Sequence, residues 1–149
     1  MKAWKLLPLV TAIISVNAVA VESTGLSLGG GLNFSPAVSL STENNSNIYS
    51  EETNEESSTI NRLTPSLAIS GDFGKTTFNA AYQAEQGSYS ANSDDDYLDQ
   101  LTSADASFEL TARHQFDIDA AYTKAHDARG SVAGAEAVNA IEPDEYSQT

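Results

Sequence analysis

The stretch RLTPSLAISGDFGKTTFNAAYQAE, residues 62–85, consists of two alternating runs on either side of a short turn, residues 71–75. The apolar side chains stand mainly at odd positions before the turn and at even positions after it: Leu63, Pro65, Leu67 and Ile69, then Phe78, Ala80, Tyr82 and Ala84. A period of two is typical of a strand with one apolar and one polar face. Runs of about ten residues joined by a short turn are typical of a transmembrane β-hairpin.

Two further segments carry the same alternation. Residues 25–40 place their apolar side chains at even positions, interrupted by Gly29-Gly30-Gly31, and Pro36 indicates a bend or a strand end. Residues 102–116 form the clearest run, and a turn at 115–117 leads into Ile118 and Tyr122. We therefore predict an all-β, antiparallel transmembrane barrel, of which about five strands are present.

Polar, acidic segments separate these strands. Residues 41–61, 86–100 and 125–149 are long and lack useful periodicity, whereas the turns inside the hairpins are short. Outer-membrane barrels alternate long external loops with short periplasmic turns. The connections therefore agree with a barrel in the bacterial outer membrane.

The parity of the apolar positions predicts the register of each hairpin. In the first hairpin the apolar face changes parity, so the loop has an even number of residues, two or four, and Arg62 lies opposite Glu85. In the second hairpin both apolar faces are even, and a three-residue turn places Arg113 opposite Asp119. Opposite charges across a strand pair stabilise a sheet by about 0.2–1 kcal/mol.

Residues 1–20 are predicted to be a cleaved secretory signal peptide. Lys2 and Lys5 precede an apolar run from Leu6 to Val16, and Ala18-Val19-Ala20 is an A-x-A cleavage site. The alternative, an uncleaved anchor, needs about 20 apolar residues to span a membrane, and this run is shorter. The remaining residues, 21–149, are assigned to the N-terminal part of the barrel.

The alternation assigns side chains to the two faces of the predicted barrel wall. The candidate lumen-lining residues are Arg62, Asn79, Gln83, Glu85, Asp105, Glu109, Arg113 and Asp119. The candidate lipid-facing residues are Leu26, Leu28, Leu32, Phe34, Leu67, Ile69, Phe78, Tyr82, Phe108, Leu110, Ile118 and Tyr122. Phe73, Phe78 and Phe116 near the short turns are expected to form an aromatic girdle.

Composition limits the chemistry. The chain has 149 residues, 7 Lys and Arg against 21 Asp and Glu, no Cys and 2 His. An excess of negative charge disfavours nucleic acid, whose phosphates need basic side chains. Without Cys there are neither disulfides nor thiolate metal sites.

No catalytic, cofactor-binding or metal-binding residues are predicted. Asp94-Asp95-Asp96 lacks the order of an EF-hand loop. The carboxylates of Asp105, Glu109, Asp117 and Asp119 are interpreted as the lining of a wetted lumen, which would favour cations if the barrel is open. We expect no enzymatic activity and no cofactor.

About five strands cannot close a barrel, since the smallest transmembrane barrels have about eight. The prediction is therefore the N-terminal portion of a longer barrel, with assembly from several chains as the alternative. A soluble periplasmic β-sandwich is a third interpretation, in which the apolar faces pack on each other.

The chain resembles the putative β-barrel porin type 2 family of Gram-negative outer-membrane proteins over most of residues 25–146. The resemblance is carried by the Gly-Leu-Ser strand at Gly25, residues 63–67 (LTPSL), Tyr82, residues 95–99 (DDYLD) and residues 142–146 (EPDEY). It implies a longer barrel, a link with capsule or exopolysaccharide production, and no catalytic residues. The expected partners are outer-membrane lipid, lipopolysaccharide, a polysaccharide and the barrel-assembly machinery. A non-pore surface-structural or adhesive barrel is the other functional reading.

Overall fold

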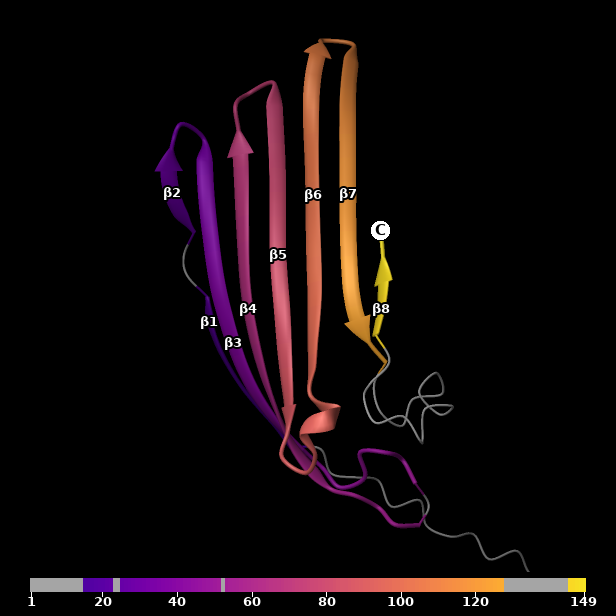
Figure 1. The fold of residues 1–149 in the computed structure, drawn as a ribbon. Coiled ribbons are helices and arrows are strands. Elements are labelled where there is room, and N and C mark those ends of the chain that lie inside the picture. Colours follow the sequence, from indigo (N-terminus) through magenta and orange to yellow (C-terminus); the bar gives the residue numbers. More distant parts are fainter. Residues whose placement is uncertain (1–14, 23–24, 52, 128–144) are drawn as a thin grey trace, which may run out of the picture.

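The computed structural model describes residues 15–22, 25–51, 53–127 and 145–149. They form one antiparallel sheet of eight strands (Figure 1). The strands are β1 (Ser15–Glu22), β2 (Leu26–Gly29), β3 (Leu32–Asn45), β4 (Ser58–Asp72), β5 (Thr76–Tyr89), β6 (Tyr97–Thr111), β7 (His114–His126) and β8 (Glu145–Gln148). Their order in the sheet is β1-β3-β4-β5-β6-β7-β8, and β2 also pairs with β3. The prediction of an all-β antiparallel architecture is confirmed, but about five strands was too few.

The sheet has a single layer, and no second layer of described residues covers either face (Figure 1). Among these residues the buried apolar side chains are Ile48, Ile60 and Tyr97, while Leu110 is 66% exposed and Leu28 60% exposed. A globular domain buries the apolar face of a sheet against another element. This sheet therefore presents an apolar face to whatever surrounds it.

Among the described residues, the one helical element is the short 3₁₀ turn η1 (Ser93–Asp95). No helix in the described residues is long and apolar enough to cross a membrane.

The two ends of the sheet differ (Figure 1). At the turn end, short connections join β2 to β3, β4 to β5 and β6 to β7. At the loop end, residues 46–57 join β3 to β4, and residues 90–96, which include η1, join β5 to β6. The predicted alternation of short and long connections is confirmed from β3 to β7.

The predicted strand at residues 25–40 is wrong, because the chain reverses in its middle. Gly29, Gly30 and Gly31 have φ angles of 83°, 62° and 88°, which favour glycine, and they turn β2 back onto β3. Pro36 is neither a bend nor a strand end. It lies within β3, where the neighbouring strand changes from β2 to β1.

The hairpin at residues 62–85 is confirmed, and its strands extend beyond the predicted limits. Partner positions have an odd sum, and four residues separate the paired Asp72 and Thr77, as parity predicted. The predicted cross-strand pair is wrong, however. Arg62 lies opposite Gly87, because the turn includes two more residues than a pairing of Arg62 with Glu85 requires. The Phe73 amide donates a hydrogen bond to the Thr76 carbonyl within this turn, at 2.9 Å.

The second hairpin turns earlier than predicted. The turn lies at residues 112–113, and Asp119 pairs with Asp105 instead of Arg113. Because both strands carry their apolar side chains at even positions, the alternation does not show where the chain reverses. The observed turn places the Phe108 and Phe116 rings side by side, with centroids 6.4 Å apart.

The predicted loops were too long, because β3, β4, β5 and β6 continue past the apolar stretch. There the face that was apolar becomes polar: Thr42 donates a hydrogen bond to Asn61 (2.9 Å) and Thr59 donates one to Asn44 (2.8 Å). Backbone pairing continues where hydrophobic alternation stops, so the sequence pattern ends before the strand does.

The segment at residues 125–149 was predicted to be polar and without a strand. β7 continues to His126, and β8 pairs with its end, Glu145 lying opposite His126. Residues 128–144, with part of the EPDEY segment, lie outside the described residues.

The predicted signal peptide overlaps an edge strand. β1 pairs with β3, Ser15 opposite Asn44 and Glu22 opposite Ala37. Residues 1–14 lie outside the described residues, so removal of residues 1–20 stays a prediction.

Gly31 and Gly74 form a matched pair for testing the turn end. Both have positive φ, 88° and 80°, so alanine at either position is strained by roughly 1–2 kcal/mol. A Cβ at Gly31 would also collide with the Asp72 carbonyl oxygen, whereas nothing lies within 4 Å of a Cβ at Gly74. We expect Gly31→Ala to lower the urea midpoint of unfolding clearly more than Gly74→Ala. Equal midpoints for the two variants would contradict the close approach of β3 to β4.

Candidate functional site

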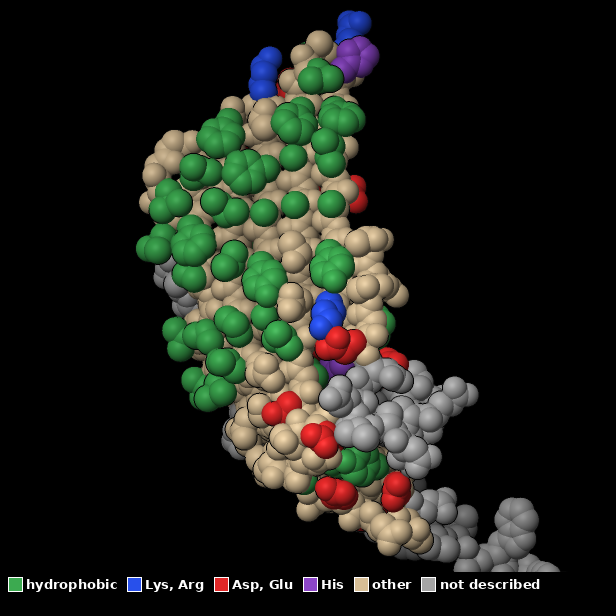
Figure 2. All heavy atoms as spheres, viewed as in Figure 1, with side chains coloured by type: hydrophobic (Ala, Val, Ile, Leu, Met, Phe, Trp, Pro, Cys, Tyr) green, Lys and Arg blue, Asp and Glu red, His purple; other side chains and the backbone are tan. Residues whose placement is uncertain are grey.

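The two faces of the sheet are chemically different. Figure 2 shows one of them, the apolar face, on which most of the green side chains gather. The register places the candidate lipid-facing residues of β3 to β7 together on this face, apart from Leu110, which lies in the irregular pairing before the β6–β7 turn. For example, Phe34 pairs with Ile69, Leu67 with Tyr82, and Ala106 with both Phe78 and Ile118. Leu26 joins them through its pairing with Phe34, and Leu28 lies in the irregular pairing before the glycine turn. Contact of this face with lipid stays a prediction.

Aromatic side chains on the apolar face lie in two zones. Near the turn end, the Phe73 and Phe78 rings stack with centroids 6.1 Å apart, beside the Phe108 and Phe116 pair. Further towards the loop end, Tyr82 and Tyr122 flank Thr102 in one row across β5, β6 and β7. A row of small side chains lies between the two zones, Ala80, Ala104 and Ala120 (Figure 2). Aromatic belts on both sides of an apolar band are typical of membrane barrels.

The opposite face, here called the polar face, carries most of the candidate lumen-lining residues. Those that the register places there are Arg62, Asn79, Gln83, Glu85, Asp105, Glu109 and Asp119. Arg113 was assigned wrongly: it lies in the turn between β6 and β7, with its amide donating to Thr111 Oγ1 at 3.3 Å.

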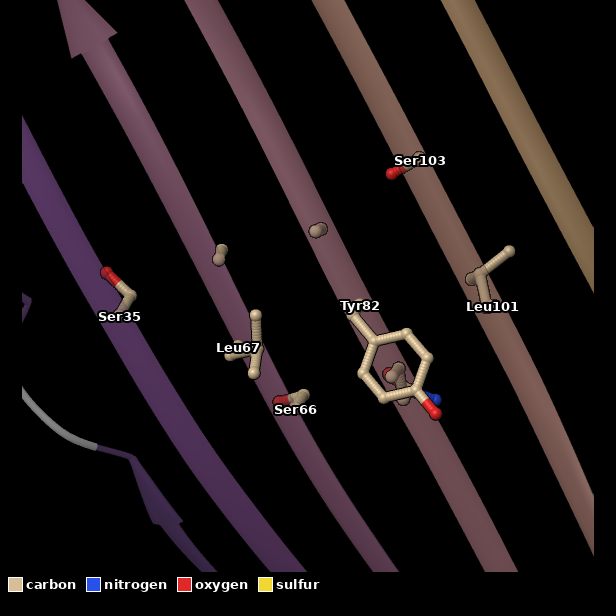
Figure 3. Close-up of a pocket in the computed structure, with 9 residues that line it drawn as sticks. Ser35, Ser66, Leu67, Tyr82, Leu101 and Ser103 are labelled. Atoms are coloured by element: carbon tan, nitrogen blue, oxygen red, sulfur yellow. The ribbon is translucent and has the colours of Figure 1, made fainter.

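The middle of the polar face is hollowed. A hollow of about 250 Å³ crosses β3, β4, β5 and β6 (Figure 3). Its lining on this face is Ser35, Ser66, Ala68, Ala81, Gln83, Leu101 and Ser103. Small side chains on neighbouring strands leave this space because they fill little volume above the backbone.

Carboxylates gather on the polar face between the hollow and the turn end. Asp105 and Asp119 lie directly opposite each other on β6 and β7, and Asn79 donates a hydrogen bond to Asp105 at 2.8 Å. Like charges in directly opposed positions destabilise a sheet. The pair is tolerable where water or cations screen it, and both side chains are exposed.

A polar network crosses the loop end of the polar face. Arg62 donates to Glu43 through Nη1 (2.6 Å) and to the Tyr97 hydroxyl through Nε (3.0 Å), and that hydroxyl donates to Glu85 at 2.6 Å. The Tyr97 ring lies over Gly87, where any Cβ would collide with it. Arg62 and Glu85 are therefore neighbours on a diagonal, with Nε and Oε1 3.7 Å apart.

The network continues to β7. The His126 ring stacks on the Tyr97 ring with centroids 3.6 Å apart. His126 Nδ1 lies 2.8 Å from Asp99 Oδ1, which also accepts the His126 backbone amide at 3.0 Å. Side chains from β3 to β7 are thus connected across one end of the sheet.

The loops at this end contact each other. The Tyr49 hydroxyl donates to Asp95 Oδ2 at 2.7 Å, and Asp95 is only 1% exposed. Burial, followed by this hydrogen bond to a carboxylate, raises the pKa of Tyr49 to about 12. The second loop is also bonded to the start of β4: the Ser90 amide donates to the Thr59 carbonyl, and the Ala91 amide donates to Ser58 Oγ.

Sequence reasoning missed Glu43, Asp99 and His126, because it placed all three in loops. The apolar alternation that marks a strand is absent where the strands extend past the apolar band. Residues 97–101, YLDQL, belong to β6 without any alternation of polar and apolar side chains, so the pattern gave no signal for this part of the strand.

Within the described part of the chain, no group of three His, Cys, Asp or Glu side chains is arranged to hold a metal ion. The polar face can supply hydrogen bonds, a hydrated acidic surface and a hollow. These are properties of a solute-contacting wall.

Comparison with protein families gives one match. Residues 20–149 match the model of the family described as "Putative beta-barrel porin 2". The chain belongs to this family. No curated protein and no solved structure is similar enough to match. The one-layer antiparallel sheet agrees with a β-barrel porin family, and the family resemblance inferred from the sequence is confirmed.

Arg62 is the centre of the polar network, so its removal should destabilise this barrel protein. Arg62→Gln leaves Glu43, 15% exposed, without its ion pair, at a cost of about 1–3 kcal/mol. The matched control is Lys124→Gln, which removes an exposed pair with Glu145 (34% and 52% exposed) worth at most ~1 kcal/mol. Denaturant unfolding of both variants checks this, and equal losses would show that the network adds nothing beyond a surface ion pair.

Proposed function

We propose that the chain forms part of the wall of a porin-like outer-membrane β-barrel, with its apolar face against lipid and its polar face towards the lumen. The observation that carries this proposal is the single-layer sheet with one apolar and one polar face. The apolar stretch of β3, Leu32 to Leu40, covers about nine residues, close to the 9–11 of a tilted membrane strand. At ~3.3 Å per residue and a tilt of ~40°, that is roughly 20 Å of membrane thickness.

The connections support one orientation. Short turns face the periplasm in outer-membrane barrels, and long loops face outward. The turn end would then be periplasmic, and the polar network would lie at the outer mouth. The family match begins at residue 20, where the predicted signal peptide ends, which supports export across the inner membrane.

The unpaired edges of the sheet support a barrel that further strands complete. β8 pairs with β7 only from Thr123 to His126, so the outer edge of β7 from His114 to Tyr122 has no strand beside it in the described residues. Unpaired backbone groups in lipid cost several kcal/mol each. We infer that a longer chain supplies the missing strands, with partner chains as the alternative source.

The partners and biological role follow from the same proposal. Lipid and lipopolysaccharide would contact the apolar face and its rims, and the barrel-assembly machinery would insert the protein. The family resemblance supports a role in capsule or exopolysaccharide production or export. We propose no catalytic role, because a wetted wall accounts for the carboxylates.

Charge on the polar face predicts cation preference. Asp105, Asp119 and neighbouring carboxylates outnumber Arg62, the one Lys or Arg on the polar face of the described strands. Charged rings in a pore favour the opposite ion. We expect the assembled protein to prefer K⁺ over Cl⁻ in bilayer reversal-potential measurements, and Asp105→Asn with Asp119→Asn to reduce that preference. Glu145→Gln, on the apolar face, is the matched control and should leave it unchanged. Anion preference would contradict the proposed pore lining.

Membrane fractionation tests the proposal itself. We expect the native protein in the outer-membrane fraction, with gel mobility that differs before and after boiling, because a closed barrel resists detergent until it is heated. Recovery from the periplasm without detergent would overturn the membrane assignment. The apolar face would then pack against a second protein layer.

A further inference from the structure

We propose that the two loops at the loop end form a constriction over the polar face, which narrows the outer mouth of the barrel to small solutes. The constriction consists of Asn47–Glu51 and Ser90–Asp96, here called the mouth cap. The role of the mouth cap in limiting solute size rests on the proposed function, because it requires that the protein forms a pore. The position of the mouth cap can be tested without any pore.

Burial shows which face the loops cover. On the polar face near the loop end, Ile60 is 3% exposed and Tyr97 is 7% exposed. On the other face at this end, Asn61 of β4 and Asn44 of the neighbouring β3 are exposed. The His126 ring on the neighbouring strand covers part of Tyr97, whereas no side chain described on the neighbouring strands accounts for the burial of Ile60. Among the described residues, the loops are the segments available to cover this end.

An apolar anchor lies in the first loop. Ile48 is 3% exposed, although it belongs to a segment whose neighbours are mostly polar. Its amide donates to the Glu56 carbonyl at 2.9 Å, which closes the loop around it. Burial of this one large apolar side chain favours a loop that leans inward over one that extends into solvent.

Local hydrogen bonds give the first loop a defined shape. Asn47 Oδ1 accepts the Glu51 amide (3.0 Å), Asn47 Nδ2 donates to the Glu51 carbonyl (2.7 Å), and the Asn47 amide donates to Asn45 (3.0 Å). Ser50 has a φ of 55° within this turn. The loop therefore reaches the second loop as a preformed turn.

The Tyr49–Asp95 hydrogen bond joins the two loops. Asp95 is in η1, whose start is capped by Asn92 through a bond from the Asp94 amide (3.2 Å). η1 leads directly into Tyr97, the centre of the network that reaches Arg62 and His126. The mouth cap is thus tied to the barrel wall on both sides.

The expected consequence is a size limit at the outer mouth. The hollow lined by serine and alanine lies beyond the cap on the same face. A solute would pass the cap first and then contact the hollow and the carboxylates. Small hydrated solutes can pass along this path, and loss of the Tyr49–Asp95 hydrogen bond should admit larger solutes.

Cysteine labelling tests the position of the cap, because the chain contains no Cys. The variants are Ile60→Cys, under the cap, and Leu101→Cys, which is 46% exposed on the same face. In the detergent-solubilised full chain, we expect a charged thiol reagent to modify position 60 at least about tenfold more slowly than position 101, since a buried site reacts only when it opens.

Adding Tyr49→Phe should speed modification at position 60 by about three- to tenfold, the effect of one lost hydrogen bond. Tyr82→Phe, on the apolar face, is the control and should change nothing.

Equal rates of thiol modification at positions 60 and 101 would overturn the proposed position of the mouth cap, whether or not the protein is recovered in the outer-membrane fraction. A second measurement uses Tyr49→Phe alone, which loses one hydroxyl group and needs no cysteine. In proteoliposome swelling, we expect this variant to admit larger neutral sugars than the parent. An unchanged size limit in a conducting barrel would also overturn the proposal, while a barrel that does not conduct at all counts against the proposed function.

Discussion

Backbone pairing within a single layer is the constraint on which the rest of this structure depends. Each interior strand of the sheet is hydrogen-bonded to a neighbouring strand on both sides, but no second layer of described residues packs against either face. Since a sheet cannot leave a broad apolar face in water, the surroundings must differ on the two sides. The proposed barrel wall between lipid and an aqueous lumen meets that requirement, and it would account for the exposed leucine and phenylalanine side chains and for burial of Tyr97 and Ile60 only at the loop end.

The polar network connects the strands at the loop end, as an apolar core connects the elements of a soluble domain. Arg62, Glu43, Tyr97 and Glu85 satisfy one another across four strands, and His126 adds a fifth. Glycine makes this possible, because Gly87 leaves room for the Tyr97 ring. On the apolar face Phe78 lies over Gly71 in the same way. An aromatic ring over a neighbouring glycine covers backbone that would otherwise be exposed.

Hairpin geometry shows how far sequence patterns can be used. In residues 62–85 the change of parity correctly predicted partner positions with an odd sum and an even number of turn residues, two or four, and the structure has four. In residues 102–123 both strands had the same parity, and the turn was placed several residues too late. Charge matching was a poor guide in both hairpins, because each proposed pair is worth less than the turn geometry that sets the register. The observed structure even accepts Asp105 opposite Asp119.

The sequence by itself determined the all-β class, the family, and the assignment of most side chains to one face or the other, because alternation with a period of two follows directly from strand geometry. Tertiary structure alone decided the exact cross-strand pairs of each hairpin, the reversal at Gly30 and the lengths of the strands. It also brought Tyr49 to Asp95 and His126 to Tyr97, pairs that are separated by 46 and 29 positions along the chain. The physical reason is that alternation records the environment of each face, whereas backbone pairing continues beyond the apolar band and depends on contacts between distant strands.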